Sequence, residues 1–243
     1  MPQRSDSQRP APQTLARPAG DDGLTLSAWL TNLVFNWDAA SHGSRRQPFA
    51  KEQTLFLEGQ PATMVYAIVE GRVRLTSFGF DGKERHLMIM GPNGLVGDCG
   101  LASTRQYVVS AVASCDAVVQ AIPTARLLAS LAQDANLMRQ HQQLVGMRFR
   151  IMLRHLAMQG SNSSRRRVCL HLLDLLNSYG AAHERGSVIS IVFTQQEMGN
   201  ICGLSRVSVS HVFTALERDS VIERAGRLVV VLDRERLEHF ART

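Results

Sequence analysis

The sequence predicts an α+β protein with a strand-rich first half and a mainly helical second half. Short runs of β-branched and aromatic residues, separated by glycine-containing turns, extend from about residue 47 to residue 122, as is typical of strands. After Pro123 the apolar residues recur at helical spacing. The chain has 243 residues, 44% of them hydrophobic, which is enough for two domains with sizeable cores.

The excess positive charge lies in the second half of the chain. The formal net charge is +6, whereas acidic and basic groups balance within residues 1–23 and within residues 24–123. Residues 124–160 carry five Arg against one Asp, and residues 161–243 carry eleven Arg against nine acidic residues. A basic second half predicts an anionic partner such as nucleic acid.

Several classes of protein are disfavoured by what the sequence lacks. It has no apolar run long enough to span a membrane and no secretion signal near its start, so we expect a cytoplasmic protein without a membrane partner. The four cysteines show neither a CxxC pair nor zinc-ligand spacing, so we expect mostly buried thiols and no metal site. A redox pair of Cys99 and Cys115 is the alternative. No G-x-S-x-G, Walker or HExxH motif is present, which argues against an enzyme.

The first 123 residues divide into three segments. Residues 1–23 are rich in Pro, Gln, Arg and Ser and predict a disordered tail. Leu24–Trp37 has apolar residues at helical spacing and predicts a short helix packed on the rest of a domain that spans residues 24–123. The strand-like runs of that domain are TLFLEG, MVYAIVEGRVRLTSF, ERHLMIM and YVVSAVASCDAVVQAI. Asp81-Gly82 is a hairpin signal, and this strand spacing indicates a small barrel or roll.

Residues 124–160 predict a short helix followed by a long one. Leu137, Leu144, Ile151 and Met158 recur every seven residues, with Met147 between them. This heptad spacing predicts a seam against the same helix of a second subunit; packing on the chain's own roll is the alternative. The dimer is favoured because the helix is apolar at five further positions, which are Val145, Phe149, Met152, Leu153 and Leu156.

Residues 161–243 have the element order of a winged helix-turn-helix. GSNSS at residues 160–164 indicates a hinge, a helix follows from Arg165, and a loop at Gly180–Gly186 leads into the strand SVISIVF. Two short helices come next. A strand, a turn at Gly226, a second strand and a terminal helix complete the chain.

The two short helices carry residues suited to DNA recognition. A capping box of Thr194 and Glu197 predicts the start of the first helix, and Gly203 permits the tight turn after it. In the second helix, residues 205–217, the buried stripe is Val209, Val212, Phe213 and Leu216. Its opposite face is slim and has no acidic residue, as a helix in the major groove requires. The predicted DNA contacts are Thr194, Gln195, Gln196, Ser205, Arg206, Val207, Ser208, Ser210 and His211. Capped helix pairs with an exposed Arg also occur in other α-rich domains, but the hairpin, the basic charge and the dimer seam favour DNA.

These segments resemble the Crp/Fnr (catabolite activator and fumarate-nitrate reductase regulator) family of bacterial transcription factors over about Ala50 to Leu237. TQQEMGNICGLSRVSVSHVFTALERDSVI is similar to the family's winged helix-turn-helix, and YAIVEGRVRL followed by GPNGLVGD is similar to its cyclic-nucleotide-binding β-roll. The resemblance implies an effector-sensing β-roll, a dimerisation helix and a palindromic double-stranded DNA operator read by a homodimer. It also implies RNA polymerase as a partner.

The resemblance further implies an altered operator. Family members often read guanine with an early Arg, cytosine with the following Glu and a second guanine with an Arg one turn on. Here Arg206 matches the first position, while Val207 and His211 replace the other two. Because Val207 cannot accept a hydrogen bond from cytosine, we expect a half-site other than TGTGA.

The effector pocket departs from the family pattern as well. Relatives that bind cyclic nucleotides hold the ribose with a Glu after a glycine and the phosphate with an Arg. Here Asp98 follows Gly97, and Tyr107 and Val108 fall where Arg and Ser or Thr would be. A buried phosphate would lack its guanidinium, so we do not expect cyclic AMP. Arg105 replaces the missing group only if the loop shifts register.

Other effectors and another class of protein are the alternatives. The cysteine cluster that holds an iron-sulfur centre in oxygen-sensing relatives has no counterpart, since the first cysteine is Cys99. We therefore expect no iron-sulfur cluster, and the effector is unknown. The alternative function is a cyclic-nucleotide-responsive regulator, or a binding module attached to an enzyme, with a divergent pocket.

Overall fold

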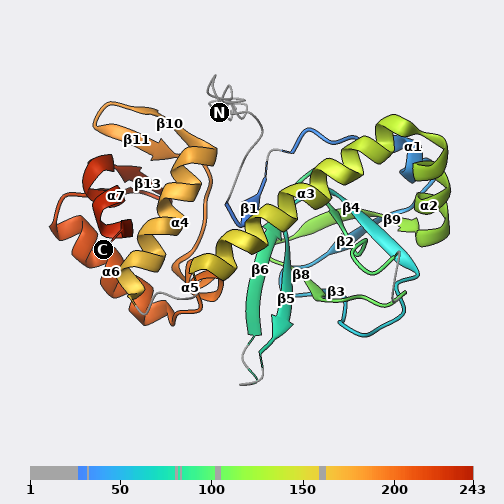
Figure 1. Cartoon of the computed structure of the whole chain (residues 1–243), viewed down its shortest axis with the longest axis horizontal. Helices are drawn as coiled ribbons and strands as arrows, with labels where there is room; N and C mark the ends of the chain where they lie inside the picture. Colours follow the sequence, from blue (N-terminus) through green and yellow to red (C-terminus); the bar gives the residue numbers. More distant parts are fainter. Residues whose placement is uncertain are drawn as a thin grey trace, which may run out of the picture.

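The computed structural model describes residues 27–31, 33–79, 82, 84–101, 105–158 and 163–242, without the side chains of residues 157 and 158. The predicted tail, residues 160–162 of the predicted hinge, and Asp81 lie outside this part. Within it, a β-roll and a helical unit lie on either side of the end of one long helix (Figure 1). None of its helices combines the length and the apolar character needed to cross a membrane.

The β-roll is built from two sheets, and all four predicted strand runs are found in it. One sheet has the order β1-β6-β5-β8-β3 and the other the order β2-β9-β4-β7. The strands are β1 (Trp29–Leu30), β2 (Arg46–Phe49), β3 (Thr54–Phe56), β4 (Met64–Glu70), β5 (Val73–Phe78), β6 (Glu84–Met90), β7 (Leu95–Val96), β8 (Ser110–Ala113) and β9 (Ala117–Pro123). Strands β5 and β6 pair antiparallel across Gly82, whose φ is +70°, which confirms the hairpin.

The turn between β4 and β5 requires glycine. Gly71 has a φ of +78°, and a Cβ built on it would lie 2.3 Å from the carbonyl oxygen of Asp116. No side chain fits at that distance, so this glycine allows β4 and β5 to cross closely over the start of β9.

The predicted helix over Leu24–Trp37 is wrong. Trp29 and Leu30 form β1, which pairs in parallel with Ile89 and Met90, and the first helix is α1 (Asp38–Ser41). The edge of β6 supplies backbone partners to this segment, including a 2.8 Å bond from the amide of Ile89 to the carbonyl of Ala28. Both β1 side chains are fully buried. This distant partner outweighs the local helical pattern.

Helix α2 (Thr124–Gln133) and helix α3 (Ala135–Met158) follow the roll. The Asp134 carboxylate caps α3, because it accepts hydrogen bonds from the amides of Asn136 and Leu137 at 2.8 and 3.1 Å. Three of the predicted seam residues, Leu137, Leu144 and Ile151, are at most 1% exposed. They pack into the hydrophobic core of their own chain.

The structure therefore corrects the face of α3 that is available to a second subunit. The heptad stripe covers the chain's own roll, which was the alternative, and Met147 is partly buried at its side. The side chain of Met158 lies outside the described part. The exposed apolar residues of α3 are the five additional ones, Val145, Phe149, Met152, Leu153 and Leu156. Burial on the roll and exposure to solvent fall on adjacent faces of one helix, which sequence spacing alone does not distinguish.

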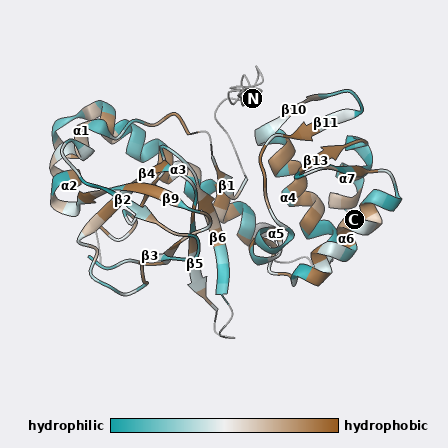
Figure 2. Ribbon diagram, turned by 180° about the vertical axis from the view of Figure 1, so that it is seen from behind, coloured by the Kyte–Doolittle hydropathy of each residue, from teal (hydrophilic) through white to brown (hydrophobic). Residues whose placement is uncertain are grey.

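The remaining elements form a winged helix-turn-helix. They are α4 (Ser164–Tyr179), β10 (Gly180–His183), β11 (Gly186–Ile189), α5 (Gln195–Cys202), α6 (Arg206–Arg218), β12 (Ile222–Ala225), β13 (Leu228–Val231) and α7 (Arg234–Arg242). The sheet order is β10-β11-β13-β12. Part of the predicted loop at Gly180–Gly186 is strand β10, because its backbone pairs with β11. Apolar residues concentrate on β9, β13 and α4 (Figure 2).

Candidate DNA-binding site and sensing pocket

The turn between α5 and α6 is fixed by three local devices. The Thr194 hydroxyl accepts a hydrogen bond from the Glu197 amide at 3.0 Å, and the Glu197 carboxylate accepts one from the Thr194 amide at 2.7 Å. Gly203 ends α5 with a φ of +65°. The Ser205 hydroxyl then caps α6 by accepting from the Ser208 amide at 3.0 Å. The capping box, the turn and the second cap are thus confirmed, and they hold α6 at a defined angle.

Helix α6 has one buried and one exposed face. Its buried residues are Val209, Val212, Phe213 and Leu216, as predicted. Arg206, His211 and Val207 are exposed, and Val207 keeps 59% of its surface. An exposed apolar side chain on this face can make an apolar contact with a thymine methyl group. The exposed face offers cations and small polar groups and no carboxylate, so it is not repelled by phosphate.

Some of the predicted DNA contacts face the β-roll. Thr194, Gln195, Gln196 and Arg206 line a cleft of about 700 Å³ whose other wall belongs to the roll. Ser205, Val207, Ser208, Ser210 and His211 are not among its lining residues. The structure therefore places the start of α5 and Arg206 beside the roll, and the other predicted α6 contacts outside this cleft.

Polar contacts join the roll to α5 and to the segment before it. The Arg72 guanidinium donates to the Val192 carbonyl at 2.6 Å and lies 3.7 Å from the Glu197 carboxylate. The Asn200 amide nitrogen lies 3.0 Å from Nε2 of His86. They add to aromatic packing between the two units, where the rings of Trp29 and Phe193 have centroids 5.7 Å apart.

Aromatic side chains occupy the predicted phosphate position in the roll. The rings of Tyr107 and Phe56 stack with centroids 3.8 Å apart, and the Tyr107 hydroxyl donates to the Met64 carbonyl at 2.7 Å. Burial raises the pKa of Tyr107 to about 12. Gly97 has a φ of +92° and lies against the Tyr107 ring, which a Cβ there would approach to 3.1 Å. Tyr107 thus acts as part of the core at this position.

Asp98, expected at the ribose position, is held by α3 instead. Its carboxylate lies 2.8 and 2.9 Å from Nη1 of Arg148 and 3.0 Å from Nε2 of His141. Burial raises the pKa of Asp98, but the charge of Arg148 and the hydrogen bond with His141 outweigh it, so that the pKa falls to about 2. Arg148 also donates to the Leu95 carbonyl. This buried cluster ties α3 to the loop after β7.

Two other predicted pocket residues lie at the surface. Arg105 is exposed with a φ of +55°, and Val108 keeps 43% of its surface. Sequence reasoning did not identify Arg148 and His141 as partners of Asp98. One signal was present, since an Arg within an apolar helical face requires an acidic partner.

The cysteines are all free. Cys169 and Cys202 are buried, Cys99 is exposed, and Cys115 is half-buried. The expectation of buried thiols therefore holds for two of the four.

Comparison with known proteins identifies both halves of the chain. The family model described as cyclic nucleotide-binding domain matches residues 46–134, and the model described as Crp-like helix-turn-helix domain matches residues 166–240. The transcriptional activator protein anr of Pseudomonas aeruginosa is 29% identical over 78% of this chain and 77% of its own. The CRP-like cAMP-activated global transcriptional regulator of Mycobacterium tuberculosis is 26% identical over 80% of this chain and 87% of its own.

A solved structure agrees with these matches. A CRP-family transcriptional regulator from Thermus thermophilus superposes with a TM-score of 0.63 at 26% identity, covering 81% of this chain and 97% of its own. The two family models account for the roll and for the winged helix-turn-helix, and these relatives are regulators of transcription and not enzymes. This chain belongs to the Crp/Fnr family of transcriptional regulators.

Proposed function

We propose that the protein is a homodimeric, sequence-specific DNA-binding regulator of the bacterial cytoplasm that inserts residues 205–217 into the major groove of a palindromic operator. The exposed face of α6 carries this proposal. Arg206 stands in its first turn and His211 lies further along the same face, and both are exposed. An Arg so placed can bond both acceptors of a guanine edge.

The operator should differ from TGTGA. Val207 has no hydrogen-bonding group, so it cannot accept from the N4 amino group of cytosine, and His211 cannot form the two parallel bonds that an Arg makes with guanine. Contact with a thymine methyl group is the interaction left to Val207. The two substitutions thus change the preferred base at two positions of each half-site.

The homodimer would form through the exposed apolar face of α3. Five of the eleven large apolar side chains that are exposed in the described part lie on this one helix. A contiguous apolar face of this kind is typical of a protein–protein contact, and a two-fold dimer would present two α6 helices to two half-sites one helical turn apart.

The sensing unit should respond to something other than cyclic AMP. Relatives named as cAMP-dependent match this chain, but here Tyr107 and Phe56 stack in the predicted phosphate position and the Asp98 carboxylate is engaged by Arg148. Isothermal titration with cyclic AMP at pH 7 should show no binding. Micromolar affinity would support the alternative, a cyclic-nucleotide-responsive regulator with a divergent pocket.

DNA binding would require the roll and α5 to separate. The starts of α5 and α6 line the cleft beside the roll, so a duplex backbone that reaches Gln195 from that side competes with the roll for the same space. A regulator that alternates between a docked and a released arrangement can be driven by any ligand that prefers one of them. RNA polymerase would be contacted in the released, DNA-bound state.

A gel-shift experiment with genomic fragments tests the function. Specific shifts should appear and weaken steeply with salt, because phosphate contacts release counterions. An exposed arginine outside the interface, Arg139 of α3, serves as the control: Arg206→Gln should lose the specific shift and Arg139→Gln should keep it. Retention of specific binding by Arg206→Gln would contradict the proposed role of α6.

A further inference from the structure

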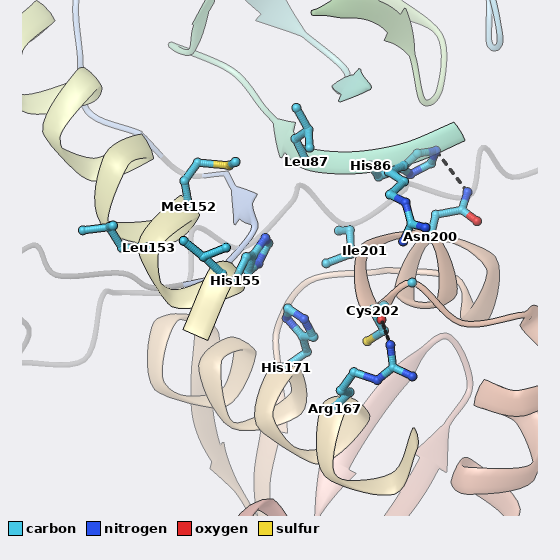
Figure 3. A pocket seen from close by; sticks show the side chains of 13 residues that line it. His86, Leu87, Met152, Leu153, His155, Arg167, His171, Asn200, Ile201 and Cys202 are labelled. Atoms are coloured by element: carbon cyan, nitrogen blue, oxygen red, sulfur yellow. Dashed lines mark hydrogen bonds between the residues drawn. The ribbon is translucent and has the colours of Figure 1, made fainter. Parts of the chain in front are cut away.

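A pocket of about 430 Å³ lies where α3, β6, α4 and α5 meet (Figure 3). Its lining residues are Arg85, His86, Leu87, Met152, Leu153, His155, Leu156, Arg167, His171, Asn200, Ile201, Cys202 and Gly203. None of them belongs to the predicted effector pocket of the roll. The volume falls within the range of small-molecule sites, and its walls come from both the sensing and the DNA-binding units.

Four buried nitrogen atoms of these lining side chains have no hydrogen-bond partner among the described residues. They are Nδ1 of His86, Nε2 of His155, Nδ1 of His171 and Nε of Arg167. His86 and His171 are themselves only 6% and 4% exposed. Buried polar groups are nearly always paired, so four unpaired ones around one pocket indicate a partner that binds there.

Two of the four unpaired nitrogens can only donate hydrogen bonds. The Asn200 amide nitrogen donates to Nε2 of His86 at 3.0 Å, so a neutral His86 carries its proton on the unpaired Nδ1. Burial lowers the pKa of His155 to about 4 and that of His171 to about 3, so each ring is neutral at pH 7, with one nitrogen that donates and one that accepts. Arg167 can only donate.

The charge and the apolar wall indicate the class of ligand. Two guanidinium groups, of Arg85 and Arg167, line the pocket, and none of its described lining residues carries a carboxylate. The apolar lining residues are Leu87, Ile201 and three residues of α3. Those three, Met152, Leu153 and Leu156, also belong to the exposed face of α3 proposed for the second subunit, which would cover this side of the pocket. In the described part no three side chains of ligand type are grouped so as to hold a metal ion. The lining therefore matches an anionic head on an apolar body.

We propose that this pocket binds a small amphiphilic carboxylate and that such a ligand is a signal of the protein. The regulatory half of this inference rests on the proposed DNA-binding function. A ligand that contacts β6 and α3 on one side and α4 and α5 on the other stabilises the arrangement in which the start of α5 faces the roll. It should therefore weaken binding to the operator.

Isothermal titration of the full chain with octanoate at pH 7 tests the pocket. Octanoate should bind, whereas acetate, which lacks the apolar body, and 1-octanol, which lacks the charge, should bind at least about tenfold more weakly. Arg167→Gln should weaken octanoate binding about tenfold or more, because it removes a charged hydrogen bond. The matched variant Arg139→Gln, on the exposed surface of α3, should bind like the wild type.

Arg167 also donates to the Cys202 carbonyl at 2.9 Å, so its replacement could disturb folding. A second variant separates a loss of ligand binding from a folding defect. Leu87→Glu places a negative charge in the pocket wall from another element, β6, and should likewise weaken octanoate binding while the melting temperature stays near that of the wild type. The pocket assignment is overturned if octanoate fails to bind at millimolar concentration, or if both variants bind it as the wild type does.

Titration of the wild type with its operator tests the regulatory half. Octanoate at a concentration that fills the wild type but not Arg167→Gln should weaken the operator affinity of the wild type and leave that of the variant nearly unchanged. An equal operator affinity of the wild type with and without octanoate would overturn the regulatory half of the proposal, while the assignment of the pocket as a binding site would stand. Absence of any specific DNA binding would instead refute the proposed function, and the calorimetry would still decide whether the pocket binds a carboxylate.

Discussion

Replacing Asp98 with Asn tests the cluster that ties the roll to α3. The substitution keeps the shape of the side chain and removes its charge, so Arg148 is left as a buried cation without a counter-ion. Arg148 is only 5% exposed and cannot turn to water without opening the contact between α3 and the roll. The expected result is a large loss of stability at neutral pH.

The magnitude follows from two considerations. Removing one partner of a buried ion pair costs about 3–5 kcal/mol, because the remaining charge is uncompensated. The pKa of Asp98 falls from 3.8 to about 2, and this shift corresponds to about 2 kcal/mol of the free energy of unfolding. Because the folded pKa is lowered, this contribution is present above pH 4 and is lost as the pH falls from about 4 to about 2.

Urea unfolding at fixed protein concentration measures both effects. At pH 7 Asp98→Asn should lower the free energy of unfolding by about 3–5 kcal/mol, and the double variant with Arg148→Met should recover part of that loss. Asp116→Asn is the control, since Asp116 is exposed, and should change stability by about 0.5 kcal/mol or less. A loss below about 1 kcal/mol would refute the reasoning. So would a free energy of unfolding of Asp98→Asn that falls between pH 4 and pH 2 as steeply as that of the wild type.

Three further predictions concern the interface with DNA, the dimer and the roll. Arg206→Gln should weaken operator binding by about 1–3 kcal/mol in fluorescence anisotropy without changing the melting temperature, whereas Arg139→Gln should change neither; equal losses would exclude a specific role for Arg206. Phe149→Glu places a charge on a side chain that is 63% exposed on α3 and should shift the chain to a monomer in analytical ultracentrifugation, so an intact dimer would move the interface elsewhere. Gly71→Ala should destabilise far more than Gly82→Ala in thermal unfolding, because both glycines have a positive φ but only Gly71 faces a carbonyl oxygen at 2.3 Å. Similar losses for the two would show that the turn after β4 relaxes.

The elements that the sequence predicts well depend on neighbours along the chain. The capping box of Thr194 and Glu197, the left-handed Gly203 and the cap at Ser205 each involve residues close together in the sequence. Their chemistry is local, so no knowledge of the tertiary structure is needed. The strand runs of the roll are similarly marked by their turns.

The elements that the sequence predicts poorly depend on distant partners. Trp29 and Leu30 form a strand because the edge of β6 lies beside them, and nothing within Leu24–Trp37 reveals that edge. The heptad stripe of α3 fits a second helix and a roll equally well, and only the burial of Leu144 decides between them.

The candidate sites follow the same rule. The outward face of α6 could be predicted, because the buried apolar stripe determines which residues on the opposite side of the helix face solvent. The ion pair of Asp98 and Arg148 could not be predicted, since it joins positions 50 residues apart. The histidines of the pocket between α3, β6, α4 and α5, such as His171, lie far apart in the sequence, and no nearby residue indicates that they meet.

The selection of bound DNA from a random pool tests the central claim most directly. We predict a palindromic site that contains a guanine for Arg206 in each half and departs from TGTGA at the bases that face Val207 and His211. The variant Val207→Glu should shift the selected base toward cytosine at the first of these positions. Enrichment of TGTGA by the wild type, or of no palindrome at all, would contradict the proposed role of α6 as a reader of an altered operator.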